Sequence, residues 1–179
     1  MRTTIAGAAL VAAVALTGCS STPTPNAPAA APSASTTTAQ PPAADKPAGP
    51  LDAKAITTGL GKKIPTMKTT LVYTEDTDPN HLLGRPGSYT SKTAFSDSRV
   101  KAAEVEGLRS DAIERGGSVE VFSTAAEAHT RAEYIGRIGK AMPAAVEYDY
   151  VSGTALVRVS RILTPTQARA YEAAAKSLG

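Results

Sequence analysis

The chain has 179 residues, with 19 Lys and Arg against 16 Asp and Glu, and its formal charge of +3 is spread along the sequence. Nucleic-acid binding needs clustered basic residues, so we expect no nucleic-acid partner. Six Tyr, two Phe and no Trp argue against a large aromatic ligand pocket. The single Cys excludes an internal disulfide and any motif of paired cysteines. The hydrophobic fraction of 42% includes 34 alanines, which predicts a small core.

The first 18 residues have the layout of a secretory signal peptide. Arg2 supplies one charge, residues 5–16 form an apolar run, and small residues precede Cys19. A helix of about 12 residues covers about 18 Å, whereas the hydrocarbon core of a bilayer is about 30 Å thick. We therefore expect a signal peptide over residues 1–18 and no permanent transmembrane helix there.

The four residues Leu16, Thr17, Gly18 and Cys19 resemble the lipobox of bacterial lipoproteins. The resemblance implies that a diacylglycerol group is attached to the Cys19 sulfur and that signal peptidase II cuts between Gly18 and Cys19. It implies a lipid-anchored protein at the extracytoplasmic face of the cell membrane. The alternatives are an ordinary secretory signal with an incidental Cys, and a cytosolic protein with an apolar N-terminal helix.

Residues 19–50 follow as the expected lipidated N-terminus and tether. From residue 20 to residue 50 the chain has no Val, Ile, Leu, Met, Phe or Tyr, while 8 of its 13 prolines fall there. Such a segment cannot bury a core, so we expect a disordered linker with polyproline II stretches. The alternative is a Pro-rich recognition segment, but no PxxP motif with flanking basic residues is present.

Residues 118–122 alternate as a strand and are followed by a helix signal. Thr124 stands three residues before Glu127, the arrangement of a capping box. Apolar residues then recur at helical spacing over residues 125–142, which predicts an amphipathic helix.

Residues 146–151 and 155–159 alternate in the same way and are separated by a short turn, which predicts a β-hairpin. A last helix is expected after Thr164, with Pro165 at its first position and Gln167 completing a second capping box.

The first half of residues 51–179 gives weaker signals. Residues 51–64 predict a frayed helix or a pair of turns, residues 69–74 and 91–97 predict short strands, and residues 98–115 predict an irregular connection or a short helix. Together the elements predict an α+β domain. We expect a mainly antiparallel sheet of four or five strands with the two principal helices packed on one face.

Residues 84–93 are rich in Gly but lack the glycines that a phosphate loop requires, so nucleotide binding is rejected. The same segment suggests a surface recognition loop, because Arg85, Tyr89 and Lys92 offer charge and a stacking face.

Asp76, Asp78 and Asn80 have the spacing of a calcium loop, but His81 stands where Gly is needed and Gly87 where a bidentate Glu belongs. We therefore predict a solvated acidic loop and no calcium site.

We expect no metal, no cofactor and no catalytic site. His81 and His129 are the only histidines, and neither a GxSxG motif nor a second Cys is present. His129 is expected to face solvent. Tyr148 and Tyr150 are expected in the sheet core, with an aromatic binding face as the alternative.

The layout of the whole chain resembles small, uncharacterised envelope lipoproteins of Gram-positive and particularly actinobacterial bacteria. The sequence thus predicts a non-enzymatic binding or accessory module that binds a partner protein or an envelope component. The alternatives are a structural spacer without a specific ligand and an envelope enzyme with an unrecognised site.

Overall fold

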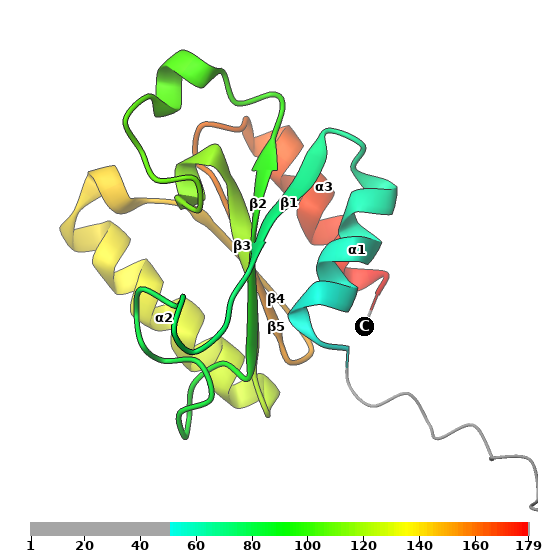
Figure 1. Ribbon diagram of the computed structural model, residues 1–179, viewed down its shortest axis with the longest axis vertical. Coiled ribbons are helices and arrows are strands. Elements are labelled where there is room, and N and C mark those ends of the chain that lie inside the picture. Colours follow the sequence, from blue (N-terminus) through cyan, green and yellow to red (C-terminus); the bar gives the residue numbers. More distant parts are fainter. Residues whose placement is uncertain (1–50, 179) are drawn as a thin grey trace, which may run out of the picture. The chain divides into compact units, whose positions relative to one another are not determined.

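Five strands form one antiparallel sheet in the computed structural model, which describes residues 51–178 (Figure 1). Their order across the sheet is β1-β2-β3-β5-β4, so the predicted hairpin of the last two strands forms one edge. The strands are β1 (Met67–Val72), β2 (Ser91–Asp97), β3 (Gly116–Val121), β4 (Tyr148–Ser152) and β5 (Ala155–Val159). The predicted α+β class and the antiparallel sheet are confirmed.

Three α-helices cover the two faces of this sheet: α1 (Ala53–Lys63), α2 (Ala125–Ala141) and α3 (Pro165–Lys176). Helices α1 and α3 pack together on one face, and α2 lies on the other face (Figure 1). The expectation that the two principal helices share one face is therefore wrong, since α2 and α3 lie on opposite faces. The reason is visible in β5, where Val157 and Val159 belong to the core under α1 and α3 while Leu156 belongs to the core under α2.

Helix α1 is regular over 11 residues, although Gly59 and Gly61 predicted a frayed helix or turns. Asp52 caps its start, because the Ala55 amide donates to Asp52 Oδ1 at 2.7 Å. A Cβ atom on Gly59 would lie 2.8 Å from the Leu178 side chain. The glycine therefore permits a close approach to the end of the chain, and this packing compensates for its low helix propensity.

Both predicted capping boxes are confirmed. The Thr124 amide donates to Glu127 Oε2 at 3.0 Å, and the Glu127 amide donates to Thr124 Oγ1 at 3.2 Å. The Thr164 amide donates to Gln167 Oε1 at 2.9 Å, and the Gln167 amide donates to Thr164 Oγ1 at 3.3 Å. These reciprocal bonds satisfy backbone amides that a helix start leaves unpaired, so they fix where α2 and α3 begin.

The larger apolar core lies between the sheet and the layer of α1 and α3. Phe95 of β2 and Tyr171 of α3 stack with ring centroids 5.2 Å apart, and the Tyr171 hydroxyl donates to the buried Asp97 at 2.6 Å. Tyr148 and Tyr150 pack against this core, which confirms their prediction as sheet-core residues. This face of the sheet is thus held mainly by apolar packing.

The connection over residues 98–115 is irregular, as predicted, and contains two short 3₁₀ helices, Ala102–Val105 and Ile113–Arg115. The Arg115 guanidinium holds it together by donating to three backbone carbonyl oxygens, those of Val105, Leu108 and Arg109. The Arg115 side chain therefore adds three hydrogen bonds to the few backbone bonds within this segment.

Residues 1–50 lie outside the described residues, and with them the expected signal peptide, Cys19 and the tether. Within residues 51–178, no helix combines the length and the apolar character that crossing a membrane requires.

Candidate functional site

A row of polar side chains crosses the α2 face of the sheet. In the strand register, Ser118 of β3 lies opposite Arg158 of β5, and Arg158 lies opposite Asp149 of β4. Two residues further along β3, Glu120 lies opposite Lys92 of β2. Because side chains alternate between the faces of a strand, all five project to the same face. Four adjacent strands therefore contribute polar or charged groups to the space under α2.

Glu120 is fully buried, and cations from α2 and from two strands surround it. Arg131 Nε donates to Oε2 at 3.0 Å, Arg158 donates to Oε1 at 3.0 Å, and Lys92 Nζ lies 4.0 Å from Oε1. Burial opposes ionisation of this carboxyl, but the charges of Arg158 and Arg131 outweigh it and hold the pKa of Glu120 below its ordinary value. Glu120 is therefore an ionised group that links α2 to the sheet.

The loop between β1 and β2 adds a second buried carboxylate, Asp78. The Tyr89 hydroxyl donates to its Oδ2 atom at 2.6 Å, and Lys92 Nζ donates to Oδ1 at 3.0 Å. The amides of Leu82 and Leu83 also donate to Oδ2, at 2.9 and 3.1 Å. Burial opposes ionisation of Asp78, but the bonds from Tyr89, Leu82 and Lys92 prevail and lower its pKa well below the ordinary value. The expectation of a solvated acidic loop is therefore wrong at Asp78.

The three residues of the predicted recognition loop lie in different environments. Arg85 is exposed, whereas Tyr89 is 0% and Lys92 4% exposed. The rings of Tyr89 and Phe122 meet edge-on with centroids 6.1 Å apart, and Lys92 Nζ lies 4.6 Å from the centroid of the Tyr73 ring. The premise that Tyr89 offers a stacking face and Lys92 a surface charge is therefore wrong, because Lys92 lies on β2 and both side chains are buried against Asp78 of the preceding loop.

Arg158 forms a bidentate ion pair with Glu147 beside the carboxyl group of Asp149. Arg158 Nε donates to Glu147 Oε1 at 2.6 Å, and a second N–H donates to Oε2 at 3.1 Å. The Oδ1 atom of Asp149 is buried and has no hydrogen-bond partner among the described residues. Burial, followed by the charge of Glu147, raises the pKa of Asp149 to about 8. At neutral pH Asp149 therefore keeps its proton.

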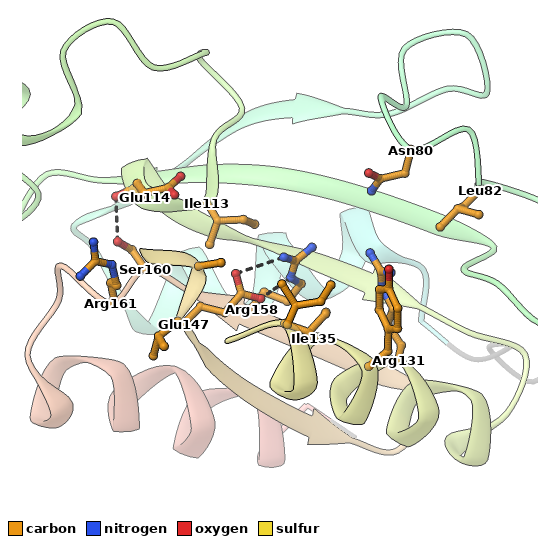
Figure 2. A pocket seen from close by; sticks show the side chains of 14 residues that line it. Asn80, Leu82, Ile113, Glu114, Arg131, Ile135, Glu147, Arg158, Ser160 and Arg161 are labelled. Carbon is orange, nitrogen blue, oxygen red and sulfur yellow. Dashed lines mark hydrogen bonds and ion pairs between the residues drawn. The ribbon is translucent and has the colours of Figure 1, made fainter. Parts of the chain in front are cut away.

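A cleft of about 430 Å³ opens between α2 and this polar row. Figure 2 shows side chains from separate segments converging on it: Asn80 from the β1–β2 loop, Ile113 from a 3₁₀ helix, Arg131 from α2 and Arg158 from β5. The ion pair of Arg158 with Glu147 forms part of its lining. A concave space of this size with both polar and apolar lining is typical of small-molecule sites.

Other groups beside the cleft make structural bonds. Ser160 Oγ donates to the Glu114 carbonyl oxygen at 2.8 Å and accepts from the Ile162 amide at 3.1 Å. His81 and His129 are exposed, and residues 51–178 contain no group of three His, Cys, Asp or Glu side chains placed to hold a metal ion. The charged groups of the cleft lining, which include Arg131, Arg158 and Glu147, are therefore the ones that suit it to a polar ligand.

No protein-family model, curated protein or solved structure matches the chain. Its function therefore has to be inferred from its own residues.

The sequence interpretation missed the buried polar residues under α2, although one signal was present. Glu120 stands between Val119 and Val121, so it projects to the face opposite these two valines. Glu120 is buried only because α2 covers that opposite face. The prediction that both principal helices pack on one face left the other face uncovered, so it gave no reason to expect a buried Glu120. Arg158 holds the corresponding position between Val157 and Val159.

Proposed function

We propose that the protein is a lipoprotein anchored at the extracytoplasmic face of the cell membrane, with a folded part that is a non-enzymatic binding or accessory module of the cell envelope. The observation that carries the anchoring is the position of the single cysteine. Cys19 directly follows Leu16, Thr17 and Gly18, which is the order that the lipobox resemblance requires. Two or three acyl chains at Cys19 give stable membrane attachment, whereas one chain alone is marginal.

The segment after Cys19 supports the same proposal. Residues 20–50 carry 8 of the 13 prolines and no large apolar side chain. A chain of this length and composition reaches between about 30 and about 95 Å. The segment is therefore suited to holding a binding module away from the bilayer surface.

The cleft favours a binding module over a structural spacer. Glu120 and Glu147 are buried or half-buried carboxylates, each paired with the guanidinium of Arg158 in the space under α2. Apolar residues of similar volume often stabilise a protein as well as buried ion pairs do. A domain that served only as a spacer would gain little from collecting these charges beside an open cleft.

An envelope enzyme is the second candidate function, and one observation favours it. The pKa of Asp149 is raised to about 8 by burial and by the neighbouring Glu147, and the two residues line a cavity beside α2. A carboxyl group that keeps its proton at neutral pH is able to act as a general acid. Chemical conversion of a bound ligand that stops in an Asp149→Asn variant would favour the enzyme, whereas recovery of unchanged ligand favours the binding module.

The test of anchoring is a Cys19→Ser variant expressed in a bacterium that processes lipoproteins. We expect the original chain in the membrane fraction, labelled by radioactive palmitate and shortened by the signal peptide. The variant lacks the sulfur that accepts the lipid, so we expect no label and no cleavage at Gly18. Membrane fractionation, label incorporation and gel mobility measure the three effects.

A Ser21→Ala variant serves as the matched control, because it changes a nearby hydroxyl group and leaves the four lipobox residues intact. It should behave like the original chain in all three assays. Equal palmitate labelling, membrane retention and mobility of the Cys19→Ser variant and the original chain would overturn the proposal.

A further inference from the structure

Strand β4 forms one edge of the sheet, and part of its main chain faces outward. The Phe122 amide donates to the carbonyl oxygen of Thr154, directly before β5, at 2.9 Å. Main-chain groups alternate in direction along a strand, so the even-numbered residues of β5 bond to β3 and the odd-numbered ones bond to β4. The register pairs these odd-numbered residues with even-numbered residues of β4, among them Tyr150. The N–H and C=O groups of Asp149 and Val151 therefore point away from the sheet.

The two edges of the sheet differ in how open they are to a further strand. No hydrogen bond within residues 51–178 engages the outward main-chain groups of β4. At the other edge, β1 carries the exposed Lys68 and a bulge between Thr69 and Leu71. Lysines and bulges on an edge strand hinder pairing with another chain, whereas a regular edge is a template for it. The register of β4 is uninterrupted and β4 has no Lys or Pro, so β4 is the edge suited to accept a strand.

The outward groups of β4 are arranged symmetrically about Tyr150. A second β4 strand running antiparallel would place the two Tyr150 residues opposite each other and each Asp149 opposite Val151 of the other copy. Each such pair exchanges both of its N–H···O bonds, so all of these outward groups find partners. A two-fold axis is also the commonest symmetry of protein oligomers. The edge is therefore complementary to itself.

The charges beside Tyr150 suit the same axis. Burial raises the pKa of Tyr150, and the charge of Glu172 adds to this rise while that of Arg169 opposes it, so both α3 residues lie near the ring. Arg169 is exposed, and Glu172 is half-buried and accepts from Lys176 through one oxygen, Oε1. Because the two copies run antiparallel, the axis brings the cation of each toward the carboxylate of the other. A foreign strand has no such match built in, so the charges favour a second copy.

The α2 face leaves room beside β4 for the added strand. A cavity of about 320 Å³ lies between α2 and β4, and Asp149 lines it. Side chains alternate along a strand, so Val151 of the second copy projects to this face opposite Asp149. Gly136 and Gly139 line the cavity from α2, and a Cβ atom at Gly136 would meet no atom within 4 Å. The helix therefore does not close off the space that the added strand needs.

We propose that β4 is a dimerisation edge, which pairs antiparallel with β4 of a second copy about a two-fold axis at Tyr150 and joins the two sheets into one. Three observations carry the inference: the outward main-chain groups of Asp149 and Val151, their symmetry about Tyr150, and the self-complementary charges of α3. The inference goes beyond the proposed function, because a dimer presents two copies of the folded part and of the cleft under α2. It does not depend on the lipid anchor.

The test is disulfide trapping in a Tyr150→Cys variant. Opposed residues that exchange no main-chain bonds have Cα atoms about 4.5 Å apart, which is within the range of about 4.4–6.8 Å that a disulfide allows. The full chain also carries Cys19→Ser, so the introduced cysteine is the only thiol and the result does not depend on lipidation. The chain is purified in detergent and oxidised mildly, and nonreducing gel electrophoresis measures the rate of dimer formation.

Thr70→Cys in the same Cys19→Ser chain is the matched control, because Thr70 is exposed on the opposite edge strand. Strand pairing holds the two thiols at a high effective concentration, so Tyr150→Cys should form the disulfide dimer at least about tenfold faster than the control. Circular dichroism and the midpoint of urea denaturation establish that each variant is folded.

A further variant adds Val151→Pro to the Tyr150→Cys chain. Proline lacks the outward N–H group and is tolerated on an edge strand where that group faces solvent. The fold should therefore persist while the crosslinking rate falls to that of the control. If Tyr150→Cys does not fold, light scattering on the Cys19→Ser chain decides, with twice the mass of one chain expected before Val151→Pro and the mass of one chain after it.

Equal crosslinking rates of the Tyr150→Cys and Thr70→Cys chains, or a rate that Val151→Pro leaves unchanged, would overturn the proposal. Oxidation in intact cells that joins Tyr150→Cys to a different protein and not to a second copy would also overturn it, in favour of a foreign strand at this edge. None of these results affects the anchoring proposal, which the Cys19→Ser variant tests separately by fractionation and labelling.

Discussion

The two faces of the sheet are stabilised in different ways. On the face under α1 and α3, strand residues such as Val119 and Val157 pack with Tyr171 in one large apolar cluster. On the face under α2, the residues that alternate with these valines are Glu120 and Arg158, which form an ion pair with N and O atoms 3.0 Å apart. The same two strands therefore contribute an apolar core to one side and a polar cluster to the other.

This difference predicts how each face responds to substitution. Apolar packing is non-directional, so a change there costs free energy in proportion to the volume and area removed. The polar face depends on pairing, because removal of one carboxylate leaves several buried cations without compensation. We therefore expect the largest single effects on the α2 face, although its apolar cluster is the smaller one.

Glu120→Ala should give the largest loss of stability. Glu120 pairs with Arg131 and Arg158 at 3.0 Å and has no exposed surface. Removing the carboxylate leaves these cations and Lys92 with too little negative charge, which should lower the free energy of unfolding by about 4 kcal/mol. Urea denaturation of the full chain followed by circular dichroism measures the change.

The control for this substitution is Glu133→Ala, which removes an exposed glutamate from the same α2 layer. Its effect should stay within about 0.5 kcal/mol. If Glu120→Ala is as mild as the control, then the charges under α2 do not stabilise that face, and the contrast between the two faces disappears.

Leu60→Ala should give a smaller loss on the other face. Leu60 is fully buried where α1 packs on the sheet. Removing its isobutyl group leaves a cavity and should lower the free energy of unfolding by about 3 kcal/mol. The same denaturation assay applies, with Leu108→Ala as the control because Leu108 is 40% exposed. A loss below that of the control would show that the α1 layer contributes little to stability.

Local patterns predicted much of the fold because local chemistry decides it. The capping boxes at Thr124 and Thr164, the strand signal in residues 91–97 and the alternation in residues 155–159 depend on neighbours in the sequence, and the structure has these elements at those positions. Helix α1 was underestimated because the fit of Gly59 against Leu178 joins residues more than a hundred positions apart.

The candidate site was harder to predict because distant pairing creates it. Tyr89 and Lys92 stand in a segment that is rich in Gly, as surface loops often are. Only their hydrogen bonds to Asp78 show that both side chains are buried. Arg158 meets Glu120 across 38 positions of sequence. No periodicity reports such a contact, so the sequence offered no sign that these charged strand residues pair with one another.

The last and smallest effect concerns Asp149. Its carboxyl group forms no ion pair among the described residues, unlike Glu120 and Glu147 on the same face of the sheet. Its folded-state pKa of about 8 lies above the ordinary value of 3.8 because of burial and the charge of Glu147. Between about pH 4 and pH 8 the unfolded chain has lost this proton while the folded chain keeps it. The folded state binds more protons in that window, so this group makes stability fall as pH rises.

Asp149→Asn should remove that fall, because the amide has a similar shape and does not titrate. The full shift corresponds to an upper bound of about 5 kcal/mol at pH 8, and because the Asp149 side chain is partly exposed and solvent screens its charge, the variant should gain about 1–3 kcal/mol in free energy of unfolding there and less at pH 5. Urea denaturation at pH 5, 6.5 and 8 measures the slope, and Asp76→Asn at an exposed position is the control. Parallel pH dependences of the Asp149→Asn variant and the original chain would mean that Asp149 is ionised in the folded protein. Asp149 would then add a second negative charge beside Glu147 on the α2 face.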